Sequence, residues 1–185
     1  MPWEIEMAKL YDPALSAEQF NDVLYKVYAA HQKAVICGGV FISYSRENSE
    51  FVDKMYERLK REGAPVWLDR HDMVAGPMQK QVDRGIRIND VVLLVLSAAS
   101  VESDWVQHEL KMAHRKEKEE GRDVLCPVAL DDAWKSKQDD VLWEPAMKFN
   151  VLDFSRWESD EWFGNQFRKL LDGMKVYYGP ARKGA

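Results

Sequence analysis

The sequence contains few cysteines and no long apolar run, and each absence excludes a class of protein. Two cysteines, Cys37 and Cys126, occur among 185 residues, and both lie in apolar, strand-like surroundings. Two thiols cannot form a dense disulfide framework, so we expect reduced cysteines in a cytoplasmic protein. The most apolar run, VVLLVLS at 91–97, is far shorter than the roughly 20 residues that span a bilayer. The first ten residues also lack the basic and apolar regions of a secretory signal.

The sequence has no excess of positive charge and no recognisable set of metal ligands. Lysine and arginine number 26 against 31 aspartates and glutamates, which gives a net charge of −5. An acidic chain is poorly suited to duplex nucleic acid or an anionic membrane, so we expect neither as a partner. The four histidines are His31, His71, His108 and His114. They do not have the spacing of metal ligands, either with one another or with a cysteine. We therefore expect no metal centre.

The chain is predicted to begin with an extension that precedes a separate domain. A capping-box pattern opens at Ser16, and apolar residues then recur at helical spacing. This pattern predicts an amphipathic helix at 17–32 inside an extension at 1–35. Its apolar face is expected to pack on the following domain, on another copy or on a partner. The domain itself is predicted at 36–178, with a flexible tail at 179–185.

Strand-like and helix-like segments alternate from residue 40 onwards. The predicted strands are 40–43, 65–69, 91–97, 124–130 and 149–155. The predicted helices are 48–62, 78–88, 103–121 and 159–178. This alternation predicts an α/β domain with a parallel sheet covered by helices on both faces. A five-stranded sheet of this kind most often has the flavodoxin-like order 2-1-3-4-5, which we expect here.

Three patterns carry expectations about burial. The run from Arg115 to Glu120 alternates in sign and is expected to be an exposed helix end. Four tryptophans of the C-terminal third are expected to pack, and the acidic pairs 131–132 and 139–140 to be solvated. The last helix is expected to bury Trp162, Phe163, Phe167, Leu170, Leu171 and Met174.

In a sheet of order 2-1-3-4-5, ligands bind beside the carboxyl ends of the first and third strands, where the order reverses. Ser43-Tyr44-Ser45-Arg46 and the stretch 97–109 lie there. A helix that Ser103 caps would place Trp105 and Glu109 on one stripe, four residues apart. We therefore expect Glu109 at the edge of the core, facing the crevice with Trp105 beside it. A half-exposed glutamate and a packing tryptophan are the alternative.

Several crevice chemistries lack their residues in this sequence. No G-x-G-x-x-G follows a strand, no G-x-S-x-G is present, and the acidic residues of a phosphorelay receiver are missing. A flavin phosphate loop is only faintly compatible with SYSRENS. One carboxylate, Glu109, remains near Trp105 and Arg46. A lone carboxylate suffices to cleave an N-glycoside whose pyridinium leaving group departs neutral, because no general acid is required.

Several spaced motifs resemble, in order, a TIR (Toll/interleukin-1 receptor) domain of the bacterial type. They are VFISYSREN (40–48), PVWLDRHDMVAG (65–76), VVLLVLS (91–97), SDWVQHEL (103–110) and VLCPVAL (124–130). The resemblance extends over about 36–178 and implies the flavodoxin-like fold. Many members cleave NAD+ to nicotinamide and ADP-ribose or a cyclised isomer. The resemblance thus implies NAD+ as the substrate and no separate cofactor.

The resemblance also implies roles for individual residues. Glu109 matches the catalytic glutamate of the family's W-x-x-x-E pattern, with Trp105 as its tryptophan. The BB loop, here 70–78, mediates self-association in the family, and NAD+ cleavage often requires it to move. Val74 and Pro77 depart from some active relatives in this loop. Substrate contacts are expected from Ser43, Tyr44, Ser45, Arg46, Asp69, Arg70, Gly76, Ser97 and Trp105.

The sequence thus predicts an NAD+ nucleosidase that acts in bacterial immune or stress signalling, such as antiviral defence. Self-assembly is expected to activate it, and a second defence or signalling protein is a possible partner. The alternative is a non-catalytic adaptor that binds other TIR domains through the BB loop. Binding of a nucleotide without cleavage is a third, weaker reading. The intact W-x-x-x-E pattern favours the enzyme, because an adaptor does not need that carboxylate.

Overall fold

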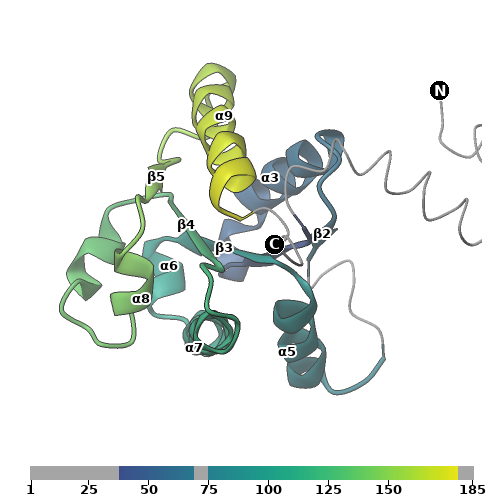
Figure 1. The fold of residues 1–185 in the computed structure, drawn as a ribbon. Helices are drawn as coiled ribbons and strands as arrows, with labels where there is room; N and C mark the ends of the chain where they lie inside the picture. The colour runs from purple at the N-terminus through teal and green to yellow at the C-terminus, as the bar shows by residue number, and fades with distance from the viewer. Residues whose placement is uncertain (1–37, 69–74, 179–185) are drawn as a thin grey trace, which may run out of the picture. The chain divides into compact units, whose positions relative to one another are not determined.

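The computed structural model describes residues 38–68 and 75–178. The expected helix at 17–32, the tail at 179–185 and residues 69–74 lie outside these described residues, and the boundary at residue 36 stays a prediction. Five parallel strands form one sheet in the order β2-β1-β3-β4-β5, as predicted (Figure 1). The strands are β1 (Val40–Ser43), β2 (Val66–Trp67), β3 (Val91–Leu96), β4 (Leu125–Ala129) and β5 (Leu152–Asp153).

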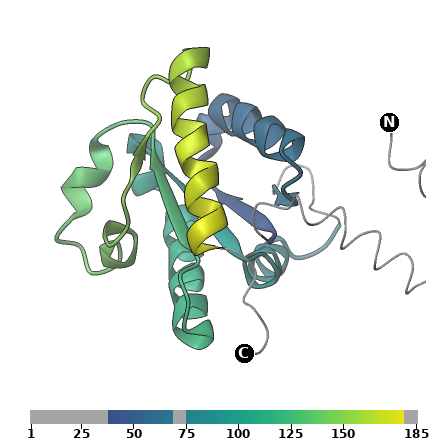
Figure 2. The same cartoon turned by 45° about the horizontal axis from the view of Figure 1, so that its top comes forward.

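Helices cover both faces of the sheet (Figures 1 and 2). One face carries α3 (Ser49–Arg61) and α9 (Asp160–Tyr177), and the other carries α5 (Met78–Ile88) and α7 (Asp104–Glu120). The shorter elements are η2 (Arg46–Asn48), α6 (Ala98–Val101), η3 (Ala133–Lys137) and α8 (Glu144–Met147). Of these, α6 was not predicted. Within the described part of the chain, no helix is long and apolar enough to cross a membrane.

The pleat of the strands divides the core into two apolar clusters. Along β1, Val40 and Ile42 join the cluster under α3 and α9, whereas Phe41 joins the cluster under α5 and α7. All six residues of β3 are buried, because helices cover both of its faces. This arrangement accounts for the uninterrupted apolar run at 91–97.

Both edge strands are shorter than predicted, and β5 is short because side chains replace a partner strand along the first half of β4. Glu117 Oε1 accepts the backbone N–H groups of Val124 and Leu125 at 3.0 and 2.9 Å. Tyr178 Oη donates to the carbonyl oxygen of Leu125 at 2.6 Å. Pro127, which lacks an N–H, is the next residue whose backbone faces the same way. It directly precedes Val128, where the pairing with β5 begins. Backbone groups that β5 would otherwise pair are therefore satisfied or absent.

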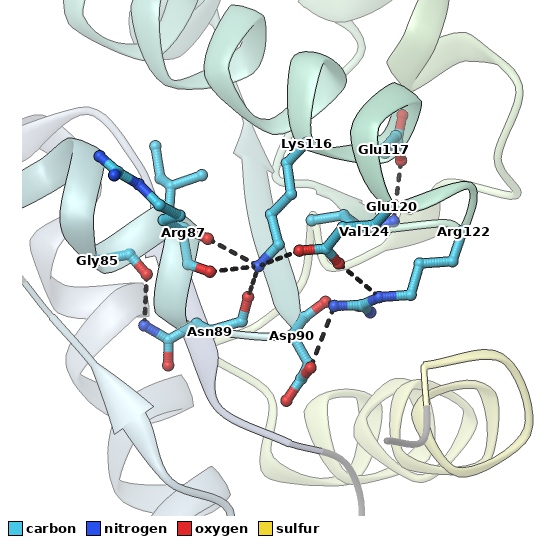
Figure 3. A network of polar contacts seen from close by, with 10 residues as sticks. Gly85, Arg87, Asn89, Asp90, Lys116, Glu117, Glu120, Arg122 and Val124 are labelled. Atoms are coloured by element: carbon cyan, nitrogen blue, oxygen red, sulfur yellow. Dashed lines mark hydrogen bonds and ion pairs between the residues drawn. The ribbon is translucent and has the colours of Figure 1, made fainter. Parts of the chain in front are cut away.

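Most of the alternating charges at the end of α7 are exposed, as predicted, but Lys116 is buried (Figure 3). Lys116 is 7% exposed, and its ammonium donates to the carbonyl oxygens of Ile86 and Arg87, at 3.0 Å each, and of Asn89. These carbonyls end α5, where a positive charge is favourable. Burial lowers the pKa of Lys116 from its ordinary value. The sequence pattern misled because it cannot show that another helix ends against this face.

Trp162 is the second correction to the predicted burial. It lies half-exposed in the first turn of α9, and its indole N–H donates to the Asp153 carbonyl oxygen at 3.1 Å. The Arg156 guanidinium lies 3.6 Å from the ring centroid. The other five residues predicted on that face, from Phe163 to Met174, are buried. Trp162 therefore packs against the connection from β5 instead of the sheet.

We predict that Lys116→Met destabilises the protein by about 2–3 kcal/mol, because three carbonyl oxygens of the α5 terminus lose their donor. Lys118→Met, on an exposed position of the same helix, is the matched control and should change stability by less than about 0.5 kcal/mol. Urea denaturation followed by circular dichroism measures both. Equal stability of the two variants would show that the ammonium does not cap α5.

A second prediction concerns Tyr178. Burial raises the pKa of its phenol above the ordinary value of 10.0. Because the folded pKa exceeds the unfolded one, the stabilisation is complete below about pH 10 and is lost as pH rises further. Tyr178→Phe should cost about 1 kcal/mol at pH 7, through loss of the bond to Leu125. Urea denaturation at pH 7 and at pH 10.5 measures the difference in unfolding free energy between parent and variant. This difference should be smaller at pH 10.5. A difference that stays constant would contradict the buried, protonated phenol.

Candidate functional site

The carboxyl ends of β1 and β3 meet where the strand order reverses, as the sequence predicted. Ser43, the last residue of β1, lies in register with Leu94 of β3. Ser97 directly follows β3 and begins α6. Helix α7, which carries Glu109, packs on the face of the sheet that Phe41 also faces. Residues from three separate segments therefore converge at this end of the sheet.

Glu109 is held in the core by the way α7 begins. Ser103 caps the helix, and its hydroxyl accepts the N–H of Val106 at 3.4 Å. Val106, Leu110 and Ala113 are fully buried against the sheet, and Glu109 lies on the same side of the helix. The Glu109 side chain is consequently 2% exposed, deeper than the edge position predicted. The cap at Ser103 and the end of the helix at Gly121 were both predicted and are confirmed, and the structure gives Gly121 a left-handed conformation.

The Glu109 carboxylate meets Ser43 at the end of β1. Ser43 Oγ donates to Glu109 Oε2 at 2.5 Å, and both residues are buried. A buried carboxylate costs several kcal/mol unless hydrogen bonds compensate for its lost hydration. A short bond from a hydroxyl to a carboxylate is of the strong, charge-assisted kind. A costly group retained at a strand-end crevice marks a candidate functional residue.

Trp105 lies one turn before Glu109 and is half-buried. Its ring packs against the apolar cluster of α5 and α7, and its centroid lies 6.3 Å from that of His108. The His108 Nε2 in turn lies 2.9 Å from Asp83 Oδ1 on α5. Trp105 therefore combines a packing role with a partly exposed ring. Both of the uses considered from the sequence, packing and stacking on a ligand, are compatible with this position.

Ser97 lies at the crevice, but its hydroxyl is engaged within the protein. Ser97 Oγ donates to Asn48 Oδ1 at 2.8 Å and accepts the N–H of Ser100 at 3.1 Å. The Ser100 hydroxyl reaches back to complete a capping box for α6. Ser97 thus joins η2 to α6 at the carboxyl end of β3. Sequence reasoning did not identify Asn48 as the partner of Ser97. It also missed α6, although two serines three residues apart could have signalled its cap.

The other predicted contacts occupy different environments. The Tyr44 side chain is buried in the cluster that α3 and α9 cover, so it forms core and not an accessible wall. Ser45 is half-buried before η2, and Arg46 is exposed at the start of η2. Gly76 is exposed just before α5, with a φ of 148° that favours glycine. Asp69 and Arg70 lie outside the described residues.

Comparison with known proteins finds several relatives by sequence. One relative, "2' cyclic ADP-D-ribose synthase AbTIR" of Acinetobacter baumannii (strain 1295743), is 28% identical over 118 residues, 63% of this chain and 38% of the relative. "NAD(+) hydrolase TcpA" of Theionarchaea archaeon (strain DG-70-1) is 33% identical over 91 residues, 48% of this chain and 27% of the relative. "Toll-like receptor 2 type-2" of Gallus gallus is 25% identical over 130 residues, 68% of this chain and 17% of the relative. The chain therefore spans less than two thirds of each relative.

A solved structure and a family model complete the comparison. The TIR domain of the Toll-related receptor TRR-2 from Hydra magnipapillata superposes with a TM-score of 0.54 at 15% identity, over 71% of this chain and 96% of that domain. At this identity the match shows the fold alone. The sequence model described as "TIR domain" matches residues 40–171, well over half of the chain. The chain belongs to the TIR domain family and is similar to its bacterial members.

Proposed function

We propose that this chain is an NAD+ glycohydrolase that cleaves the bond between nicotinamide and ribose, with Glu109 as its catalytic residue. The observation that carries the proposal is the buried Glu109 carboxylate, which Ser43 holds at the carboxyl end of β1. Relatives named as an NAD+ hydrolase and a cyclic ADP-ribose synthase support the choice of substrate. Nicotinamide would leave, and water would add to the ribose carbon and release a proton to solvent, which gives ADP-ribose. If an atom of the same nucleotide adds there instead, the product is a cyclic isomer.

The chemistry requires little beyond one well-placed negative charge. Nicotinamide is bound to the ribose as a pyridinium and departs neutral, so its departure needs no proton donor. As the bond breaks, positive charge develops on the ribose, and a nearby carboxylate stabilises it electrostatically. A carboxylate in a buried site is more effective than one in water, because less solvent screens it. Glu109 fits this role through its burial and fixed orientation.

Other residues at this end of the sheet suit the remaining parts of the substrate. The half-exposed Trp105 ring can stack on a flat heterocycle, and the Arg46 guanidinium can pair with phosphate. Ser45 and Gly76 remain proposed contacts, as do Asp69 and Arg70 outside the described residues. Self-association through the loop at 70–78 is proposed to activate the enzyme. A bacterial defence or signalling role and a cytoplasmic location are part of the same proposal.

A non-catalytic adaptor is the second candidate function. It is favoured by a relative named as a receptor, Toll-like receptor 2 type-2, which matches 68% of this chain. An adaptor needs no buried carboxylate at the crevice, so Glu109 counts against this reading. The two candidates differ in whether the assembled protein releases nicotinamide.

We predict that Glu109→Gln lowers nicotinamide release from NAD+ by at least about 100-fold, because the amide lacks the charge that stabilises the transition state. The glutamine keeps the size of the side chain and an oxygen that can accept from Ser43. Glu119→Gln, an exposed position on the same helix, is the matched control and should retain parental activity. Chromatographic measurement of nicotinamide at high protein concentration tests both, with thermal unfolding as the check on folding.

Two outcomes would contradict the enzyme proposal. Full activity in a folded Glu109→Gln variant would exclude Glu109 as the catalytic residue. An inactive parent chain that stays inactive when fused to an obligate oligomer would favour the adaptor, because assembly would then have been supplied.

A further inference from the structure

We propose that Ser43 is a positioning residue for Glu109, which fixes the carboxylate and does not itself contact the substrate. The inference rests on the proposed function of Glu109 and specifies how its carboxylate is held. The family resemblance alone placed Ser43 among the substrate contacts. Its burial and its bond to Glu109 assign it a different role.

The hydrogen bond of Ser43, and not burial alone, assigns its role. Both residues of the pair are buried, with 0% of Ser43 and 2% of Glu109 exposed, so their exposure does not distinguish them. The Oγ–H bond is directed to Glu109 Oε2 at 2.5 Å. A hydroxyl has one proton to donate, and here Glu109 receives it. Ser43 can therefore influence the substrate only through the carboxylate.

The backbone of Ser43 is held by pairing with the central strand β3. Strand β1 pairs with β2 on one side and with β3 on the other, and Ser43 itself lies in register with Leu94. On the opposite side of the bond, Val106 and Leu110 anchor α7 in the core. Donor and acceptor thus come from two rigid elements, 66 residues apart in the chain. Such support is what an oriented catalytic group requires.

The choice of serine has no explanation in packing alone. The preceding residue on the same face of β1, Phe41, is apolar and stacks on Trp67 with centroids 4.8 Å apart. An apolar residue at 43 would suit a fully buried strand equally well, but it would remove the donor to Glu109. A hydroxyl orients the carboxylate and leaves its negative charge intact, whereas a lysine or arginine would neutralise it. Serine at this position thus matches the needs of Glu109.

The test compares Ser43→Ala, Ser43→Thr and Ser43→Cys with the parent. Loss of the donor in Ser43→Ala should lower kcat about tenfold or more, with KM changed less than about twofold. The acid limb of the pH–rate profile should move to higher pH, because the charged carboxylate loses a hydrogen bond. Threonine keeps the hydroxyl and should restore kcat to within about threefold of the parent. Cysteine is similar in size to serine but is a weaker donor, so the kcat of Ser43→Cys should lie between those of the alanine and threonine variants. This variant replaces Ser43→Ala in the comparison if the alanine variant does not fold.

A readout independent of activity accompanies the kinetics. The side-chain carboxyl carbon of Glu109 can be followed by NMR during acid titration of the free protein. Its titration midpoint should move to higher pH in Ser43→Ala and should stay near the parental value in Ser43→Thr. Ser159→Ala is the control for a purely structural effect, because it removes the side-chain cap of α9, which packs on the other face of the sheet from α7. That variant should lower the melting temperature and leave the titration of Glu109 unchanged.

The outcomes separate this inference from the proposed function. A Ser43→Ala variant with raised KM and unchanged kcat would show that Ser43 contacts substrate, and would overturn the inference. A lower melting temperature with an unchanged titration and kcat would reduce Ser43 to a structural role. Neither result would affect Glu109 as catalyst, provided that Glu109→Gln is inactive. Conversely, an active Glu109→Gln variant would defeat the proposed function, whatever Ser43 does to the titration.

Discussion

The pleat of β1 is the constraint on which the rest of the structure depends. Its four residues are buried on both faces, so each side chain must suit one of two different clusters. Alternation sends Ile42 toward α3 and α9, and leaves Ser43 to meet α7. A shift of one residue in this strand would place an isoleucine against the Glu109 carboxylate. The register of β1 with β3 therefore fixes the candidate site together with the core.

Helix α7 is anchored at both ends, and this makes it a rigid support for Glu109. Its first turns are held by the Ser103 cap and the bond between Glu109 and Ser43. Its last turns are held by Lys116 at the end of α5 and by Glu117 at the start of β4. Each anchor joins the helix to a different element, so tilting α7 would break polar contacts at buried positions. A side chain on such a helix is placed more accurately than one on a loop.

Membership of the TIR family does not by itself decide what the chain does. Proteins of this family similar to the chain are named both as NAD+ hydrolases and as receptors. A shared fold can support either activity, so the argument has to come from the site. Here the distinguishing feature is a carboxylate that is costly to bury and has a dedicated donor. Neither property contributes to a surface that only binds another domain.

The sequence by itself determined the features that depend on neighbouring residues. Apolar periodicity predicted the strands and helices, and local capping residues predicted both ends of α7, because these signals act within a few residues. The strand order was expected only as the commonest arrangement of five such strands, and the structure has that order. The spacing of Trp105 and Glu109 likewise placed the carboxylate at the correct end of the sheet. The motif could not show that Ser43 would be its donor.

Only the tertiary structure decided which polar groups meet. Each polar pair joins residues that are far apart in the chain. Ser43 is 66 residues from Glu109, Asn48 is 49 from Ser97, and Ile86 at the end of α5 is 30 from Lys116. Charge alternation predicted an exposed Lys116, but the lysine is buried because α5 ends beside it. The edge strand β5 is short because Glu117 and Tyr178 occupy the backbone groups it would have paired. Such pairings depend on the distance between segments in space, which no local pattern of residues records.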